Sequence, residues 1–144
     1  MNAQEMWELY SAKHKVNAAY QAWQFGADPD ELAMLVLDGI KTATASAFCW
    51  YEAENQELPR IGEYSIVLNS KDEAVCIIRT TNVYIVPFDE VRAEHAYKEG
   101  EGDRSLQYWR DVHADFFKAE FAEAGLTFTD RTSVVCEEFV CVFP

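Results

Sequence analysis

Positively charged side chains are scarce in this sequence. It has 12 lysines and arginines against 25 aspartates and glutamates, which gives a formal net charge of −13. Proteins that coat long nucleic acids depend on basic surfaces, because contacts with phosphates supply most of their non-specific affinity. The composition therefore disfavours tight binding to long RNA or duplex DNA. It leaves room for a small or single-stranded nucleic-acid ligand in a local pocket.

Long apolar segments are also missing. No apolar run approaches the roughly 20 residues that span a bilayer. The first ten residues, "MNAQEMWELY", have neither the basic nor the apolar region of a signal peptide. We therefore expect no membrane partner and a cytoplasmic location.

The common catalytic signatures are absent as well. There is no G-x-S-x-G elbow, no Walker A loop, no G-x-G-x-x-G, no H-E-x-x-H and no paired C-x-x-C. The four cysteines are scattered through apolar segments, so we expect reduced structural thiols and predict no metal ligands among them. Function must then be sought in shorter local features.

The sequence does contain enough apolar material for one folded domain. Its 144 residues are 49% apolar and 14% aromatic, which suits a single globular domain rather than a disordered chain. We assign residues 1–28 to an N-terminal helical extension and residues 29–144 to the main body. The predicted class is α+β: a small, partly closed β-barrel with a mixed or antiparallel sheet and three to four flanking helices.

Residue patterns place the elements of this fold. Strands are predicted at residues 42–49, 63–68, 73–86 and 133–143. Helices are predicted at residues 3–12, between Asp28 and Gly39, and at residues 104–123, where Asp103 is the predicted N-cap. A short helical turn is predicted near residues 88–96. Residues 17–28 and 51–62 are predicted loops. The helical residues expected to face the core are Met6, Leu9 and Tyr10, then Leu32, Leu35 and Val36, then Leu106, Trp109, Val112, Phe116 and Phe117.

The first candidate site follows Gly39, where the pattern changes from helical to alternating. Lys41 stands before the predicted strand, and Thr42, Thr44 and Ser46 form its hydroxyl face. A partly desolvated lysine could bind a phosphate or activate a neighbouring hydroxyl nucleophile. The structural alternative is a cation that complements a helix C-terminus. In a regular strand, positions 41 and 44 point to opposite faces, so a working pair would require a bulge or turn.

Two further features have both a functional and a structural interpretation. The first is the acidic loop of Glu99, Glu101 and Asp103. It could provide a general acid or base at Glu99, or bind a metal ion weakly. The structural interpretation is that these acids only stabilise the start of the next helix. Ser105 is either a ligand contact or a helix-start hydroxyl. The second feature is an aromatic and basic set that either stacks bases and meets a phosphate or belongs to the core. Its members are Trp50, Tyr51 and Arg60. We interpret the three histidines as ordinary packed or surface residues.

Together these segments resemble a known family. The stretch "GIKTATA" resembles the G-x-K-T-x-T signature of the ASCH domain, a small β-barrel related to the PUA RNA-binding fold. It is followed in the expected order by "LPRIGEYSIVL", "AVCIIRTTNVYIVPFDEV" and "AEHAYKEGEGDRSLQYWRDVHADFF". The resemblance covers residues 30–143 and is greatest to the longer subgroup, which has an N-terminal helical extension.

The resemblance implies chemistry linked to RNA. Some similar members are linked to ribonuclease activity aided by a divalent metal, manganese or magnesium. A shorter branch hydrolyses the acetyl amide of N4-acetylcytidine, and its catalytic residues fall on Lys41, Thr44 and Glu99. Ser105 is the candidate hydroxyl of the longer subgroup. The extension and the longer loops of this chain depart from the shorter branch, while the order of the motifs is kept.

We therefore expect a hydrolase directed at RNA or a nucleoside, with Lys41 at the centre of its cleft. The predicted catalytic residues are Lys41, Thr44, Glu99 and Ser105, and the predicted ligand contacts are Thr42, Trp50, Tyr51 and Arg60. Two alternatives remain: a non-catalytic module that binds RNA or a nucleotide, and a protein-interaction domain. The sequence does not predict an oligomeric state.

Overall fold

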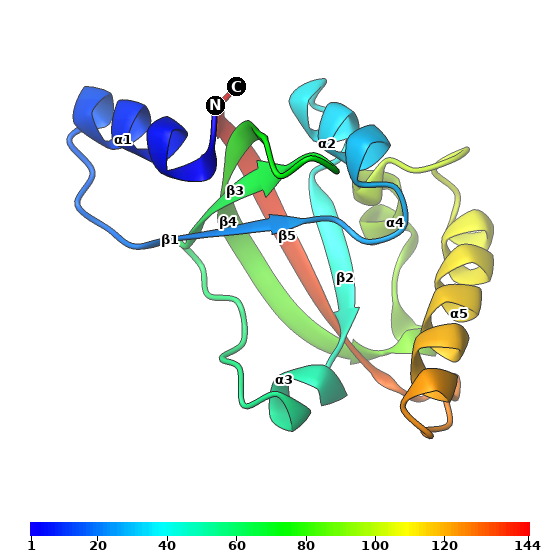
Figure 1. The fold of residues 1–144 in the computed structure, drawn as a ribbon. Coiled ribbons are helices and arrows are strands. Elements are labelled where there is room, and N and C mark those ends of the chain that lie inside the picture. The colour runs from blue at the N-terminus through cyan, green and yellow to red at the C-terminus, as the bar shows by residue number, and fades with distance from the viewer.

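The computed structural model describes residues 1–144 as one five-stranded sheet with five α-helices around it (Figure 1). The strands are β1 (Tyr20–Gln24), β2 (Ala43–Ala47), β3 (Tyr64–Leu68), β4 (Ala74–Pro87) and β5 (Ser133–Phe143). The α-helices are α1 (Ala3–His14), α2 (Pro29–Leu37), α3 (Cys49–Ala53), α4 (Ala93–Glu99) and α5 (Leu106–Glu123), and a 3-10 helix spans Phe88–Glu90. The predicted α+β class is confirmed, with more helices than expected because two of them, α3 and α4, are short.

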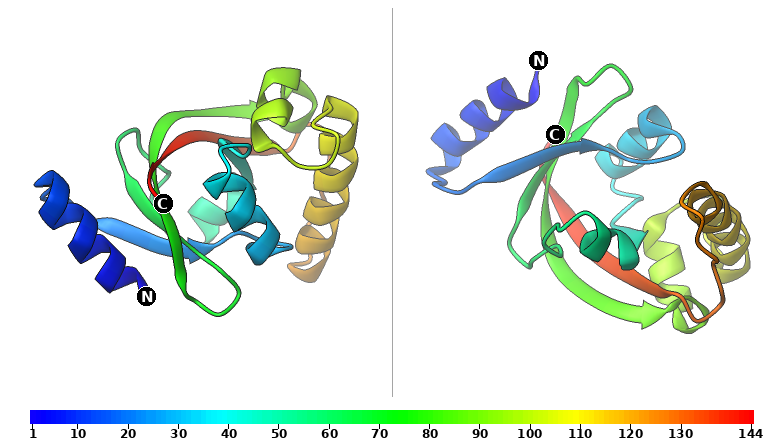
Figure 2. Two further views of the ribbon diagram at one scale, coloured as in Figure 1. Left: turned by 90° about the horizontal axis from the view of Figure 1, so that it is seen from above. Right: turned by 60° about the horizontal axis from the view of Figure 1, so that its bottom comes forward.

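The sheet has the strand order β1-β3-β4-β5-β2. Strand β1 runs parallel to β3, and the other three pairings are antiparallel. The long β4–β5 pair forms the middle of the sheet, with register shifts at Ile77/Ile78 and Thr80/Asn82. Such irregularities bend a strand and increase its twist. The sheet therefore curls into a partial barrel whose two edges, β1 and β2, are not hydrogen-bonded to each other (Figure 2).

Three apolar clusters join the helices to this sheet. Helices α4 and α5 pack on β2 and β5 through residues that include Trp109, Phe117 and Val134. Helix α2 packs inside the curl through Leu32, Ala33 and Val36. Helix α1 covers the other end of the sheet, so α1 and α5 lie at opposite ends of the molecule in all three views (Figures 1 and 2). None of these helices combines the length and the apolar character needed to cross a bilayer.

Two predicted loops contain regular structure. Residues Tyr20–Gln24 form an edge strand, because a parallel neighbour, β3, is available 44 positions away in the chain. Its glutamines are exposed, as an edge position allows, so the local pattern lacked a strong strand signal. Residues Cys49–Ala53 form the short helix α3, whose start has no side-chain cap. The prediction of a strand as far as Cys49 and a loop from residue 51 is therefore wrong here, because no capping residue signals the start of α3.

The predicted helix faces need correction at several positions. In α1 the buried residues are Met6, Trp7 and Tyr10, whereas Leu9 is 53% exposed. In α2, Ala33 is buried and Leu35 is only partly buried. In α5, Trp109, Phe117 and Phe121 are buried, whereas Val112 and Phe116 are exposed. A helix in contact with a curved sheet on one side buries a stripe whose position depends on the docking angle, which the sequence does not specify.

The caps are mostly those expected. The Asp28 side chain accepts a hydrogen bond from the amide of Glu31, and Gly39 has the left-handed φ of 78°. Helix α5 is capped by Ser105 rather than Asp103, since the Ser105 hydroxyl accepts from the amide of Tyr108. Asp103 instead accepts from the amide of Ser105 and orders the turn before the cap.

Candidate functional site

Lys41 enters the protein interior through a tight turn after α2. The left-handed Gly39 reverses the chain, and the amides of Ile40 and Lys41 both donate to the carbonyl of Leu35, at 2.9 and 3.0 Å. This turn directs the lysine inward, where the residue is only 2% exposed.

The loop after α4 reaches the same turn because Gly100 has no side chain. A Cβ on Gly100 would lie 2.8 Å from the carbonyl oxygen of Ile40, which is closer than real Cβ contacts allow. The φ of Gly100 is also left-handed, at 75°. The sequence therefore places Glu99 and Glu101 against Lys41 by means of a glycine between them.

Glu99 is the centre of the resulting cluster. One carboxylate oxygen, Oε2, accepts from His95 Nε2 and from Trp109 Nε1, each at 2.6 Å. The other, Oε1, lies 3.5 Å from Lys41 Nζ and 3.4 Å from His113 Nε2. Lys41 Nζ also lies 3.1 Å from Oε2 of Glu101. Every oxygen of Glu99 thus faces a hydrogen-bond donor.

The charges in this cluster stabilise one another. Burial alone would raise the pKa of Glu99, but Lys41 and the two histidines outweigh it and hold this pKa well below its ordinary value. Burial lowers the pKa of His113, yet the Glu99 carboxylate and the Trp109 carbonyl raise it above its ordinary value overall. Glu99 is therefore an anion that orients its neighbours, and His113 is a potential proton donor.

Lys41 and Thr44 share a pocket. Strand β2 begins at Ala43, so Lys41 precedes the regular strand and is not constrained to the face opposite Thr44. Both residues line a pocket of about 150 Å³ together with Glu99, Glu101 and His113. Its outer wall is apolar and includes Leu32, Val112 and Phe116. Lys41 Nζ donates to Glu99 and Glu101, and no hydrogen bond joins it to Thr44.

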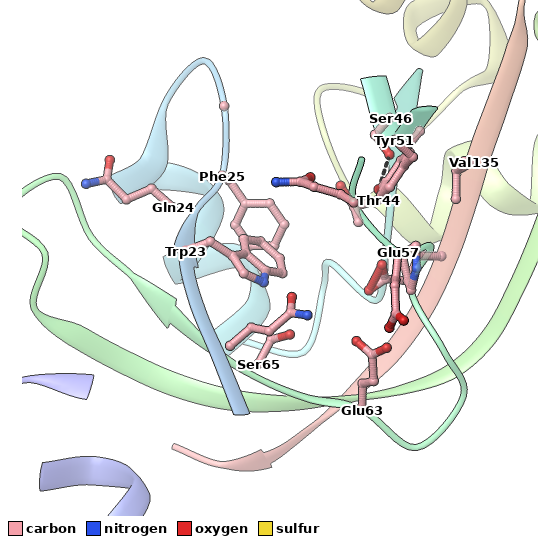
Figure 3. A pocket seen from close by; sticks show the side chains of 16 residues that line it. Trp23, Gln24, Phe25, Thr44, Ser46, Tyr51, Glu57, Glu63, Ser65 and Val135 are labelled. Atoms are coloured by element: carbon pink, nitrogen blue, oxygen red, sulfur yellow. Dashed lines mark hydrogen bonds between the residues drawn. The ribbon is translucent and has the colours of Figure 1, made fainter. Parts of the chain in front are cut away.

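A larger cavity of about 650 Å³ adjoins this pocket, and the two share Phe25, Gly26, Thr44 and Ala45. It lies between the unpaired sheet edges, with Trp23 of β1 and the following Phe25 on one side and Thr44, Ser46 and Tyr51 on the other (Figure 3). Its size is that of a small-molecule site.

The walls of the larger cavity contain acids but no lysine or arginine. Glu57, Glu63 and Glu137 all line it. Burial and the nearby Glu63 raise the pKa of Glu137 to about 7, although a hydrogen bond from Thr80 acts in the opposite direction. A phosphate group would find no cation here.

The other predicted site residues are dispersed. Tyr51 lines the larger cavity, where its hydroxyl lies 2.8 Å from that of Ser46. The amide of Thr42 donates to the carbonyl of Lys98, outside both pockets. Trp50 faces α5 and donates to Glu120 at 2.7 Å. Arg60 has a 68% exposed side chain paired with Glu57, and Ser105 caps α5. The catalytic role of Ser105 and the ligand roles of the other four residues stay predictions.

Sequence reasoning missed three members of the cluster: His95, His113 and Trp109. A signal was present, because His95 and Glu99 are four residues apart on one helix, as are Trp109 and His113. It was not sufficient, since the docking of α5 on α4 brings the two pairs together.

A divalent metal does not fit well among these groups. Ligand atoms of Glu99, Glu101 and His113 lie within 4.8 Å of one another. However, the ammonium of Lys41 contacts both carboxylates and occupies the space between them and the pocket's other donors. A metal ion would have to displace the lysine, so these residues do not fit a divalent metal.

Comparison with known proteins is consistent with the fold. The ASCH domain model matches residues 21–143. An ASCH domain structure from Lactobacillus crispatus JV V101 is 30% identical over 100% of this chain and 97% of its own, with a TM-score of 0.88. A protein from Enterococcus faecalis V583 is 35% identical over 99% of this chain and 88% of its own, with a TM-score of 0.91. No curated protein matches the sequence.

Proposed function

This chain belongs to the ASCH domain family, a PUA-like fold associated with RNA binding, and we propose that it hydrolyses an acyl amide on a cytidine-type nucleoside. The observation that carries the proposal is the meeting of Lys41, Thr44 and Glu99 in one pocket beside a larger cavity. These are the residues onto which the resemblance to the acetylcytidine-hydrolysing branch maps.

In the proposed reaction, the hydroxyl of Thr44 attacks the acyl carbonyl carbon. Lys41 gives one proton to the departing nitrogen and takes the hydroxyl proton of Thr44, so it ends the step as an ammonium. The C–N bond breaks, the cytidine amine leaves, and the acyl group remains as an ester on Thr44. Water then hydrolyses this ester to a carboxylic acid and restores the hydroxyl.

The surrounding residues have supporting roles. Glu99 holds Lys41 and His113 in place, since its low pKa and saturated oxygens make it a poor proton carrier. The Lys41 ammonium stabilises the negative charge that develops on the carbonyl oxygen. The role of Glu99 in this proposal is thus to position neighbouring groups, in place of the general acid or base expected from the sequence.

The charge of the larger cavity favours a free nucleoside over an RNA strand. Its lining has three glutamates and no cation, which disfavours phosphates close to the reacting group. Ribonuclease activity and non-catalytic RNA binding are the competing functions. The nearby Arg60 is exposed and could meet a phosphate outside the cavity, which is the observation in their favour.

One assay separates these functions. The protein is incubated with free N4-acetylcytidine and, in parallel, with a short single-stranded RNA that carries one N4-acetylcytidine, with and without manganese, and the products are read by mass. We expect loss of the acetyl group from the nucleoside, abolished by Thr44→Val and retained by Ser46→Ala. Shortened RNA would indicate a ribonuclease. No change in either substrate would contradict the hydrolase proposal.

A further inference from the structure

Glu137 is a buried acid that the proposed reaction does not use. The residue is 9% exposed and lines the larger cavity. Its only hydrogen bond within the protein is accepted by Oε2 from the hydroxyl of Thr80, at 3.2 Å. The other carboxyl oxygen has no protein partner. A buried carboxyl group that faces a cavity with free hydrogen-bonding capacity is suited to recognising a ligand.

The sheet register places Glu137 next to the reacting hydroxyl. In the β2–β5 ladder, Glu137 is the direct partner of Thr44. Residues directly opposite in an antiparallel pair lie on the same face, with Cβ atoms about 4.5–5.5 Å apart. Both residues line the larger cavity, and Thr44 also lines the pocket that contains Lys41. A ligand edge held by Glu137 would therefore place its neighbouring substituent at Thr44.

The surroundings of Glu137 favour its protonated form at higher pH than for an ordinary glutamate. Glu63 and Glu57 are the other acids on the cavity wall, and Tyr51 is the remaining titratable group there. No lysine or arginine lines this space to offset their charge. Burial and Glu63 raise the pKa of Glu137 to about 7. Near neutrality, much of the population carries a carboxylic acid instead of a carboxylate.

A carboxylic acid and a carboxylate recognise different partners. The neutral acid offers one O–H donor and one oxygen acceptor, whereas the carboxylate offers acceptors only. The edge of an N4-acylated cytosine has a ring-nitrogen acceptor beside an N–H donor, and the edge of cytosine has the same pair. Only the neutral acid can satisfy both groups at once.

Building on the proposed function, we propose that protonated Glu137 is the specificity-determining residue of the larger cavity, where it binds the acceptor–donor edge of a cytosine-type base. The base lies between the β1 side, with Trp23, and the β2 side, with Tyr51 (Figure 3). The acyl nitrogen is then next to Thr44. Aromatic side chains favour a planar ring in this position.

Cytidine is the probe for this site, because it has the recognised edge and cannot be deacylated. The dissociation constant of cytidine is measured by calorimetry from about pH 6 to about pH 8.5. Above the pKa of Glu137, this constant should rise about tenfold per pH unit, because only protein with protonated Glu137 can bind cytidine. Glu137→Gln offers the same donor and acceptor without a titration, so we expect a pH-independent constant. Glu137→Leu should weaken binding more than about tenfold, as both hydrogen bonds are lost.

A neighbouring residue provides the matched control. Glu138 follows on the same strand, pairs with Lys98 and does not line the cavity. Glu138→Gln should retain the wild-type pH profile. A wild-type constant that is flat with pH, or one that Glu137→Leu leaves unchanged, would overturn the proposal. Thermal melting of each variant confirms that it is folded.

The two proposals fail in different ways. If cytidine binds with the expected pH profile but N4-acetylcytidine is not hydrolysed, the hydrolase proposal is wrong and the role of Glu137 stands. If N4-acetylcytidine is hydrolysed with the same KM by the wild type and by Glu137→Leu, the role of Glu137 is wrong and the hydrolase proposal stands.

Discussion

The ammonium of Lys41 lies 3.5 Å from the carboxylate of Glu99, with each side chain only 2% exposed. The two residues are 58 positions apart in the sequence. Taking two charges out of water is costly, and the cost is offset here because Glu101, His95, His113 and Trp109 complete the network. This buried pair links the turn after α2 to the end of α4.

Removing the cation should therefore destabilise the protein strongly. Lys41→Met keeps the length of the side chain but leaves Glu99 and Glu101 without their shared partner. We expect a loss of about 3–5 kcal/mol in the free energy of unfolding, as for other broken buried pairs, measured by urea denaturation. Lys98→Met removes a 44% exposed lysine from its pair with Glu138 and should cost less than about 1 kcal/mol. Equal losses in the two variants would contradict this account of the cluster.

His113 should contribute stability in a pH-dependent manner. Its pKa is raised above the ordinary 6.5 in the folded protein, so its contribution is fully present below pH 6.5 and is lost as the pH rises through the folded value. The difference in unfolding free energy between the wild type and His113→Gln should therefore shrink with rising pH across this range. Taking the difference cancels the titration of groups common to both proteins. A difference that stays constant across this pH range would be evidence against the ion pair.

The burial of Glu137 should make the free energy of unfolding depend on pH. Its folded pKa of about 7 exceeds the ordinary 4.5, so the folded state binds more protons than the unfolded state between these values. Stability then falls as the pH rises through this interval. Relative to wild type, Glu137→Gln should gain roughly 3 kcal/mol between about pH 4 and about pH 8. Denaturation curves at the two pH values check this, and a constant difference would show that Glu137 is not buried as a neutral acid.

Gly100 should tolerate substitution less well than Gly39. Both have a left-handed φ, which costs an alanine roughly 1–2 kcal/mol. A Cβ at Gly39 meets open space, whereas at Gly100 it would lie 2.8 Å from the Ile40 carbonyl oxygen. Gly100→Ala should therefore cost about 1–3 kcal/mol more than Gly39→Ala, and it should impair turnover because it moves Glu99 and Glu101 away from Lys41. Comparable unfolding energies for the two variants would show that the loop can shift freely.

Arg60 distinguishes a nucleoside enzyme from an RNA-binding module. Its side chain is 68% exposed and lies outside the cavity, paired with Glu57. We expect Arg60→Ala to leave the cytidine dissociation constant unchanged within about twofold, since exposed ion pairs contribute little. The same variant should weaken affinity for a short single-stranded RNA if the protein serves as an RNA-binding module, and titration of both ligands gives the answer.

The sequence predicted the parts of this fold that depend on local chemistry. The Asp28 cap, the Gly39 stop and the strands β3, β4 and β5 follow from residues adjacent in the chain. Strand β1 was missed because its pairing with β3 is distant in sequence and its exposed side chains are mostly polar. The buried face of α5 differs from the predicted face for a related reason. The angle at which a helix docks depends on the surface against which it packs.

The same distinction, between local chemistry and contacts between distant segments, applies to the candidate site. Lys41, Thr44 and Glu99 stood out as chemical groups in a recognisable order, and the structure brings them to one pocket. His95 and His113 were interpreted as ordinary residues because the spacings His95–Glu99 and Trp109–His113 do not show that the two pairs meet. Their roles depend on α5 packing against α4. Similarly, nothing local to Glu137 shows that its strand position faces a cavity rather than solvent.

The absence of hydrogen bonds between β1 and β2 affects how a ligand can enter the cavity. In a closed barrel, widening the interior would break hydrogen bonds between strands. Here the 650 Å³ cavity opens between two edges that share no such bonds, so β1 can move relative to β2 while both ladders stay intact. The width of the entrance can therefore differ between relatives, or change during a binding event, with little effect on the stability of the sheet.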